Sequence, residues 1–195
     1  MKAYKEFIVS PIGERYNNST KVDNKQLILN TEVYNHHYVN RLAKVIATPL
    51  LFSSPINVGD EVIIHHNVFR RWLNVKGVEK NSRSYLGDNR YLISEDQIFL
   101  YNNNGLRAMP GFSFVKPLKK TSKFNTENEK PLIGVIKYSD GTFDKEELVG
   151  FTPGSEYEFV IGNERLYRVL NKFITIKYEY QGNEEEYNPS WAQSS

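Results

Sequence analysis

The most restrictive feature of this 195-residue chain is an internal repeat, in which a series of short apolar segments in the first half returns in the same order in the second half. The segments of the first half are 7–11, 58–64, 87–93 and 97–100, and those of the second half are 114–117, 153–160, 162–169 and 173–176. A repeat constrains the architecture before any single residue is considered. It predicts two copies of one module of about 90 residues each, which is a usual domain size.

The composition favours strands. The chain has 13 Tyr and 11 Phe, with β-branched residues throughout, and such residues suit a pleated, half-buried surface. Segments such as 173–180 alternate apolar and polar residues, the period of a strand with one buried face. No window carries a sustained apolar stripe at helical spacing. The sequence therefore predicts an all-β fold of two tandem small β-barrels, the second shortened and diverged.

Turn-forming and polar segments divide the chain. Asn and Gly cluster at 102–105, which predicts a tight turn between the modules. We therefore expect one module at 1–104, a second at 105–181, and a loosely held acidic tail at 182–195. The first module contains a long loop at 13–32 that is polar and rich in Asn, Lys and Ser, and we expect this loop to be mobile. Within it lies an abrupt aliphatic triplet, Leu27, Ile28 and Leu29.

Composition also excludes several function classes. With no cysteine, the chain has no disulfide, thiol nucleophile or thiolate metal site. A formal net charge of +2 gives no case for nucleic acid or an anionic membrane as partner. No apolar run approaches the roughly 20 residues of a membrane helix, and the N-terminus lacks a signal-peptide core. These features predict a cytoplasmic protein.

Histidine pairs raise the question of a metal. All four histidines stand in the pairs His36-His37 and His65-His66, and imidazole nitrogens bind zinc or copper. Adjacent residues on a strand point to opposite faces, so at most one of each pair can face a common site. We expect neither a metal site nor any cofactor.

Basic and acidic clusters are better explained as solvated surface. Five cations lie near Trp72 in the sequence, namely Arg70, Arg71, Lys76, Lys80 and Arg83. A second group of cations lies in the next module and consists of Lys116, Lys119, Lys120 and Lys123. Such a pattern can bind single-stranded nucleic acid, and an oligonucleotide-binding barrel stays a possible interpretation. Catalytic motifs are missing, and the acidic runs 146–147 and 184–186 indicate solvated charge. We expect no enzyme activity.

An ordered set of short motifs resembles the GroES family of co-chaperonins. In that family the first strand ends near a proline and is followed by a long loop with an aliphatic triplet. After the loop come a return strand, a strand that begins with Gly-Asp, and a last strand that follows an acidic-Ile element. The matching segments here are 8–11, 13–32, 45–47, 58–62 and 94–99. In the second half 133–136 matches the return strand and 153–157 the Gly-Asp strand, with Ser155 where the family has Asp.

The resemblance implies a co-chaperonin that caps a GroEL-type chaperonin as a homo-oligomeric ring, with Leu27, Ile28 and Leu29 as the chaperonin contact. A tandem form with one binding loop suggests a bacteriophage or an organelle as its source. For the triplet, an ordinary buried strand is an equal alternative. For the whole chain the alternative is a virion-type structural or assembly scaffold that uses the barrel only to oligomerise.

Overall fold

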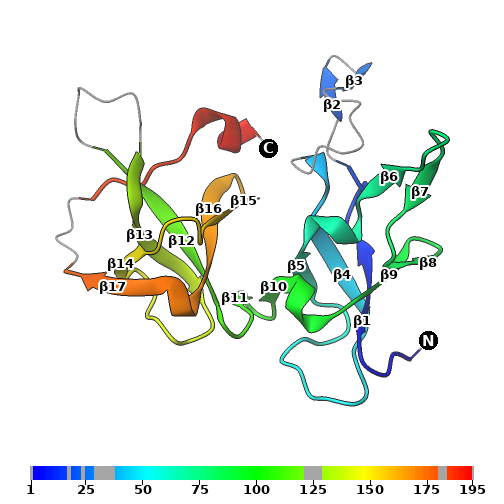
Figure 1. The fold of residues 1–195 in the computed structure, drawn as a ribbon, viewed down its shortest axis with the longest axis horizontal. Coiled ribbons are helices and arrows are strands. Elements are labelled where there is room, and N and C mark those ends of the chain that lie inside the picture. The colour runs from blue at the N-terminus through cyan, green and yellow to red at the C-terminus, as the bar shows by residue number, and fades with distance from the viewer. Residues whose placement is uncertain are drawn as a thin grey trace. The chain divides into compact units, whose positions relative to one another are not determined.

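The computed structural model describes residues 2–16, 19–22, 25–28, 38–120, 129–179 and 184–194. Within them the chain forms strands joined by turns and short 3-10 helices, so the predicted all-β class is confirmed. The chain divides into two compact units, Met1–Leu106 and Arg107–Ser195, which are coloured blue to green and green to red in Figure 1.

Unit 1 contains a main sheet and two small hairpins. Its strands are β1 (Phe7–Pro11), β2 (Ser19–Val22), β3 (Lys25–Ile28), β4 (Leu42–Ala47), β5 (Glu61–Ile64), β6 (Arg71–Leu73), β7 (Glu79–Asn81), β8 (Tyr85–Gly87), β9 (Arg90–Ile93) and β10 (Ile98–Asn102), with the 3-10 helices η2 (His66–Val68) and η3 (Glu95–Gln97). Strand β11 (Leu106–Ala108) completes a seven-stranded sheet in the order β11-β10-β5-β4-β1-β9-β8. Strands β2 and β3 pair only with each other, as do β6 and β7.

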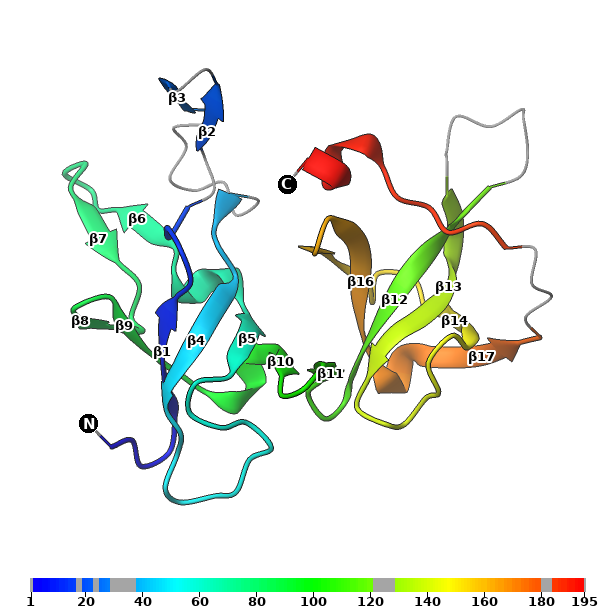
Figure 2. The same ribbon diagram turned by 180° about the vertical axis from the view of Figure 1, so that it is seen from behind.

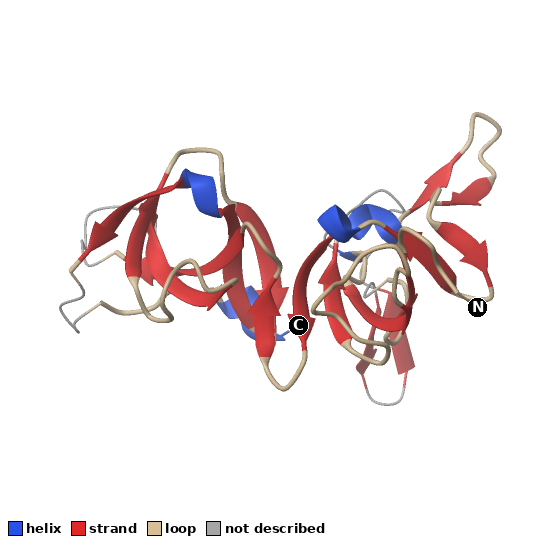
Figure 3. Ribbon diagram, turned by 90° about the horizontal axis from the view of Figure 1, so that it is seen from below, coloured by secondary structure: helices blue, strands red, loops and turns tan. Residues whose placement is uncertain are grey.

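Unit 2 is built on one six-stranded sheet. Its strands are β12 (Phe112–Lys119), β13 (Glu129–Ser139), β14 (Leu148–Phe151), β15 (Tyr157–Ile161), β16 (Glu164–Leu170) and β17 (Ile174–Tyr178), with the 3-10 helices η4 (Asn171–Phe173) and η5 (Ser190–Ser194). The sheet order is β15-β16-β12-β13-β14-β17. In each unit the strands curl around a centre rather than lying in one plane (Figure 3).

The two units share one topology. The order β10-β5-β4-β1-β9-β8 in unit 1 corresponds strand for strand to β17-β14-β13-β12-β16-β15 in unit 2. Both first-strand pairings also contain a register shift, between Ile8 and Val9 in unit 1 and between Phe114 and Val115 in unit 2. Because bulges are placed features of a strand rather than accidents, the repeat in the sequence is a repeat of structure.

The register of the strands makes the cores equivalent residue by residue. In unit 2 the main apolar cluster consists of Val115, Ile136, Val149, Phe151 and Val169. At the corresponding ladder positions of unit 1 lie Val9, Val45, Val62, Ile64 and Ile93, all buried. The alternation that produces such a core is clear in β4, where every second residue is buried.

One sequence match between the halves is wrong. The sequence pattern predicts that 153–160 corresponds to the Gly-Asp strand at 58–64. In the structure the counterpart of β5 is β14, which ends before Pro153, so 153–160 is not the equivalent strand. Both segments contain a glycine with positive φ, Gly59 at 97° and Gly154 at 71°, and this shared turn signal produced the false match. The match of 87–93 with 162–169 stands, because β8–β9 and β15–β16 are both hairpins with two positive-φ turn residues.

The acidic tail is not loosely held over 184–194. Leu118 and Glu186 form an antiparallel bridge, and the amide of Tyr187 donates to the carbonyl of Pro117 at 2.8 Å. Asn188 accepts from the amide of Arg165 at 2.9 Å, and Ala192 is buried. This segment therefore extends the structure of unit 2, and Figure 2 shows it crossing the end of β12.

Candidate partner-binding site

The loop between β1 and β4 contains the aliphatic triplet. Within it β2 and β3 form an antiparallel hairpin that pairs Thr20 with Leu27 and Ser19 with Ile28, separate from the seven-stranded sheet (Figure 1). Leu27 and Ile28 therefore belong to β3, whereas Leu29 lies outside the described residues. Among the described residues β3 pairs with β2 and not with the seven-stranded sheet, and the alternative of an ordinary buried strand stays a prediction.

A compact neck closes the base of this loop. Tyr16 and Val39 form a bridge, and the amide of Asn40 donates to the carbonyl of Arg15 at 2.9 Å. The Asn40 side chain is buried. Its amide nitrogen donates to the carbonyls of Ile12 and Glu14 at 2.8 and 2.7 Å, and its oxygen accepts from the amide of Leu42 at 2.8 Å. One side chain thus joins both strands of the neck.

The neck is also fastened to the β6–β7 hairpin. The guanidinium of Arg15 donates to Asn81 Oδ1 at 2.7 Å and to the carbonyl of Phe69 at 2.8 Å. The amide of Arg71 donates to the Tyr16 hydroxyl at 2.7 Å, and the Arg71 guanidinium lies 4.6 Å from the Tyr16 ring centroid. Two cations and two polar side chains therefore fix the loop base to the second hairpin.

Beneath the neck lies an aromatic part of the core. Tyr91 is fully buried and packs edge-on against Phe69, with ring centroids 4.8 Å apart. Burial raises the pKa of its phenol, and the Arg15 guanidinium, 5.4 Å from the ring centroid, opposes that rise. Because the Arg15 guanidinium lies over the buried Tyr91 ring, the neck is in direct contact with the core of unit 1.

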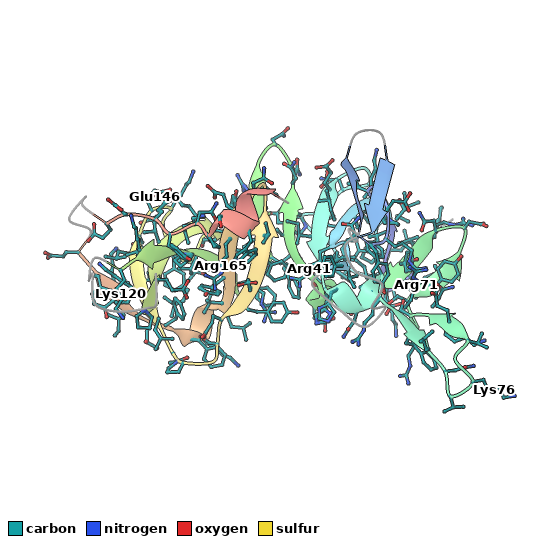
Figure 4. The ribbon with its side chains drawn as sticks, turned by 90° about the horizontal axis from the view of Figure 1, so that it is seen from above. Arg41, Arg71, Lys76, Lys120, Glu146 and Arg165 are labelled. Atoms are coloured by element: carbon teal, nitrogen blue, oxygen red, sulfur yellow. The ribbon has the colours of Figure 1, made fainter. Side chains whose placement is uncertain are left out.

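The basic-aromatic cluster lies on and beside the β6–β7 hairpin. Arg71 pairs with Glu79 at 2.8 Å, and Trp72 Nε1 donates to the carbonyl of Asn81 at 3.1 Å. Lys76 and Lys80 are exposed. The cluster therefore lies on a paired hairpin whose lysines are solvated, as expected, with Arg71 at its base and Lys76 at its tip (Figure 4).

For the lysines of the second module, the solvated interpretation is wrong at one position. Lys116 is only 2% exposed, and its ammonium donates to Asn188 Oδ1 at 3.1 Å under the tail. Burial lowers its pKa, while the carboxylates of Glu164 and Glu186 act in the opposite direction. Lys119 pairs with Glu185 at 2.9 Å, and Lys123 lies outside the described residues.

A polar network in unit 2 pairs the carboxylates of Glu129 and Glu158. Arg165 pairs with Glu129 and, at 2.7 Å, with Glu158, and the Tyr167 hydroxyl donates to Glu129 at 2.7 Å. Burial raises the pKa of Tyr167, and the bond to Glu129 raises it further. This network joins β13, β15 and β16, with Arg165 at its centre (labelled in Figure 4), and it is arranged as a structural clamp because each of its carboxylates already holds a partner.

The histidines present no metal centre in the described ranges. His65 and His66 stack with ring centroids 4.4 Å apart, and His65 Nδ1 accepts from the amide of Asn67. The pair His36-His37 lies outside the described residues. In the part of the chain that is described, no group of three or more His, Asp or Glu side chains could hold a metal ion.

Among the described residues no helix is long and apolar enough to cross a membrane.

The sequence indicates the aliphatic triplet as a contact but contains no signal for the neck. Asn40, Arg15 and Tyr16 stand in no motif, and only their non-local partners reveal their role. No protein-family model matches this chain, and a search of curated proteins gave no match.

Proposed function

We propose that this chain is a co-chaperonin that caps a GroEL-type chaperonin in an ATP-dependent cycle, with Leu27, Ile28 and Leu29 as the contact. The observation that carries the proposal is the β2–β3 hairpin, which lies outside the main sheet and is held on a buried neck. The duplicated topology of the units supports it, as does the ordered set of GroES-like motifs.

A contact on such a loop suits a lid that must leave in every cycle. Burying an aliphatic side chain contributes on the order of 1.5–3 kcal/mol, so three would bind strongly if nothing opposed them. Ordering a loop upon binding costs conformational entropy and offsets part of this gain. Several loops held in one ring then act together through effective concentration, which gives tight but reversible capping.

The sheet edges support assembly into a ring. Strand β17 lies at the edge of its sheet, and Ile176 and Tyr178 on it are 49% and 37% exposed. The corresponding strand β10 in unit 1 is followed in its sheet by β11 and is almost wholly buried. An exposed edge strand is a template for pairing with another chain, so we place a subunit contact at β17.

The test is a binding and ATPase assay with a bacterial GroEL-type chaperonin, with and without ATP. We expect nucleotide-dependent binding that slows the ATPase. The variant Ile28→Asp is expected to abolish both effects while its circular dichroism and thermal unfolding stay unchanged. Val58→Asp, which changes an exposed valine of unit 1 outside the loop, serves as the matched control. Normal capping by Ile28→Asp would show that the triplet is not the contact.

A structural or assembly scaffold is the second candidate. It is favoured by exposed apolar side chains on the segment between β4 and β5, namely Leu50, Leu51 and Phe52. Exposed apolar patches mark protein-protein contacts. A scaffold would form stable oligomers but would bind no chaperonin at any nucleotide state, so the same assay separates the two.

A further inference from the structure

The β6–β7 hairpin is an addition to unit 1 that the shared topology does not require. In unit 2, β14 and β15 are joined directly by residues 152–156, whereas unit 1 inserts η2, β6 and β7 between the corresponding β5 and β8. The hairpin is also the element to which the neck of the β2–β3 loop is fastened, through Arg15–Asn81 and Tyr16–Arg71.

The tip of this hairpin is held by hydrogen bonds although it is exposed. Asn74 Oδ1 accepts from the amides of Lys76 and Val78 at 3.0 and 2.9 Å, and the amide of Asn74 donates to the carbonyl of Val78 at 3.0 Å. Gly77 supplies the positive φ, 73°, that the turn requires. The turn holds Val75 fully exposed and Val78 half exposed. A fixed apolar tip loses little entropy when it binds.

The two faces of the hairpin differ in their surroundings. Arg71 pairs with Asn81 across the ladder, and this face carries the contacts to the neck. Trp72 lies opposite Lys80, and because neighbouring residues of a strand point to opposite sides, these two face away from the neck. Trp72 is 48% exposed. The outward surface of the strands therefore presents Trp72 and Lys80, and the exposed side chains of Val75, Lys76 and Val78 lie at the turn that joins these strands.

We propose that the β6–β7 hairpin is a second contact arm for the partner that the β2–β3 loop binds, and that its outward surface fits an apolar patch bordered by carboxylates on that partner. The inference rests on the proposed co-chaperonin function. It is supported by the direct attachment of the hairpin to the loop neck and by the positive charges of Lys76 and Lys80. Tryptophan, here Trp72, is among the side chains that most often dominate the energetics of an interface.

The experiment is a titration of the full chain against a GroEL-type chaperonin with ATP present. The double variant Val75→Ser with Val78→Ser is expected to weaken binding about tenfold, the change that 1.4 kcal/mol produces, while leaving the fold intact. Val58→Ser is the control, since Val58 is an exposed valine outside both hairpins. The double charge reversal Lys76→Glu with Lys80→Glu is expected to weaken binding most at low salt, with the difference shrinking as salt rises.

The outcomes separate the inference from the function on which it rests. If the unmodified chain binds and the valine variant binds equally well, the hairpin inference is overturned and the co-chaperonin proposal stands. If the unmodified chain binds no chaperonin, both are overturned. A parallel titration with single-stranded poly-dT tests the rival partner. Steeply salt-dependent binding that Trp72→Ala removes would identify a nucleic-acid surface instead and overturn the inference.

Discussion

At the scale of single residues, Asn40 carries the neck of the candidate site. It is 6% exposed and satisfies two carbonyls and one amide with a single side chain. Its amide group suits this position because it can donate and accept at once. A residue of this kind cannot be recognised from the sequence, since the chain holds many asparagines with ordinary turn contexts.

We predict that Asn40→Asp lowers the free energy of unfolding of the chain by about 2–3 kcal/mol, because it removes two donors and sets a carboxylate against two carbonyl oxygens. Urea denaturation at neutral pH measures this loss. Asn103→Asp in an exposed turn is the control and should change stability by less than about 0.5 kcal/mol. Equal stability of the two variants would show that Asn40 does not hold the neck.

We predict that Asp140 makes unit 2 sensitive to acid. Partial burial acts to raise the pKa of its carboxyl, but hydrogen bonds from Thr142, Gly111 and Asn171 outweigh it and place the pKa below its ordinary value of 3.8. A group whose pKa is lowered by folding stabilises the folded state above its unfolded pKa, and this contribution is lost as the pH falls through the lower, folded value.

Stability measured by urea denaturation should therefore fall between neutral pH and the range below about pH 4, the ordinary aspartate range. In Asp140→Asn the fall should be shallower, because the substituted side chain does not titrate. An unchanged pH profile in this variant would assign the acid sensitivity to other carboxylates.

At the scale of elements, the close approach of β12 and β13 depends on Gly134. A methyl group built on its Cα would overlap the backbone carbonyl oxygen of Lys116 and the Val115 side chain. The corresponding residue of unit 1 is Ala43, so both units keep a small residue opposite the proline of the first strand. The overlap is with backbone, which cannot move aside as a side chain does.

Gly134→Ala is expected to destabilise the protein by about 1–3 kcal/mol, the usual cost of overpacking. Gly150→Ala should cost less, because its nearest new contact is a side-chain atom of Tyr178 at 3.0 Å. Thermal unfolding of both variants measures the order. If Gly150→Ala lowers the unfolding temperature more than Gly134→Ala does, the close approach of β12 and β13 does not depend on Gly134 as proposed.

At the scale of the whole molecule, the exposed edge at β17 predicts oligomerisation. Ile176→Lys places a charge on that edge, a device that blocks strand pairing between chains. We expect this variant to run as a monomer in size-exclusion chromatography with light scattering while the unmodified chain runs as an oligomer. Val58→Lys is the matched control and should leave the oligomer unchanged. Persistence of the oligomer in Ile176→Lys would move the contact to another surface.

The sequence predicts the all-β class, which the structure confirms, and it predicts two repeated modules with a turn at 102–105, close to the division that the structure has between Leu106 and Arg107. It could do so because alternation and turn residues are local signals. It also singled out Leu27, Ile28 and Leu29 as a candidate contact, by their contrast with a polar loop.

Which strands correspond, which side chains hold the loop and which segment covers Lys116 are visible in the three-dimensional structure alone. Strand β14 is the counterpart of β5 because of its neighbours in the sheet, not because of any shared motif. Asn40 and Arg15 act on partners distant in the chain, and the tail covers Lys116 through contacts that span about seventy residues. Such pairings depend on long-range geometry, for which composition and periodicity contain no signal.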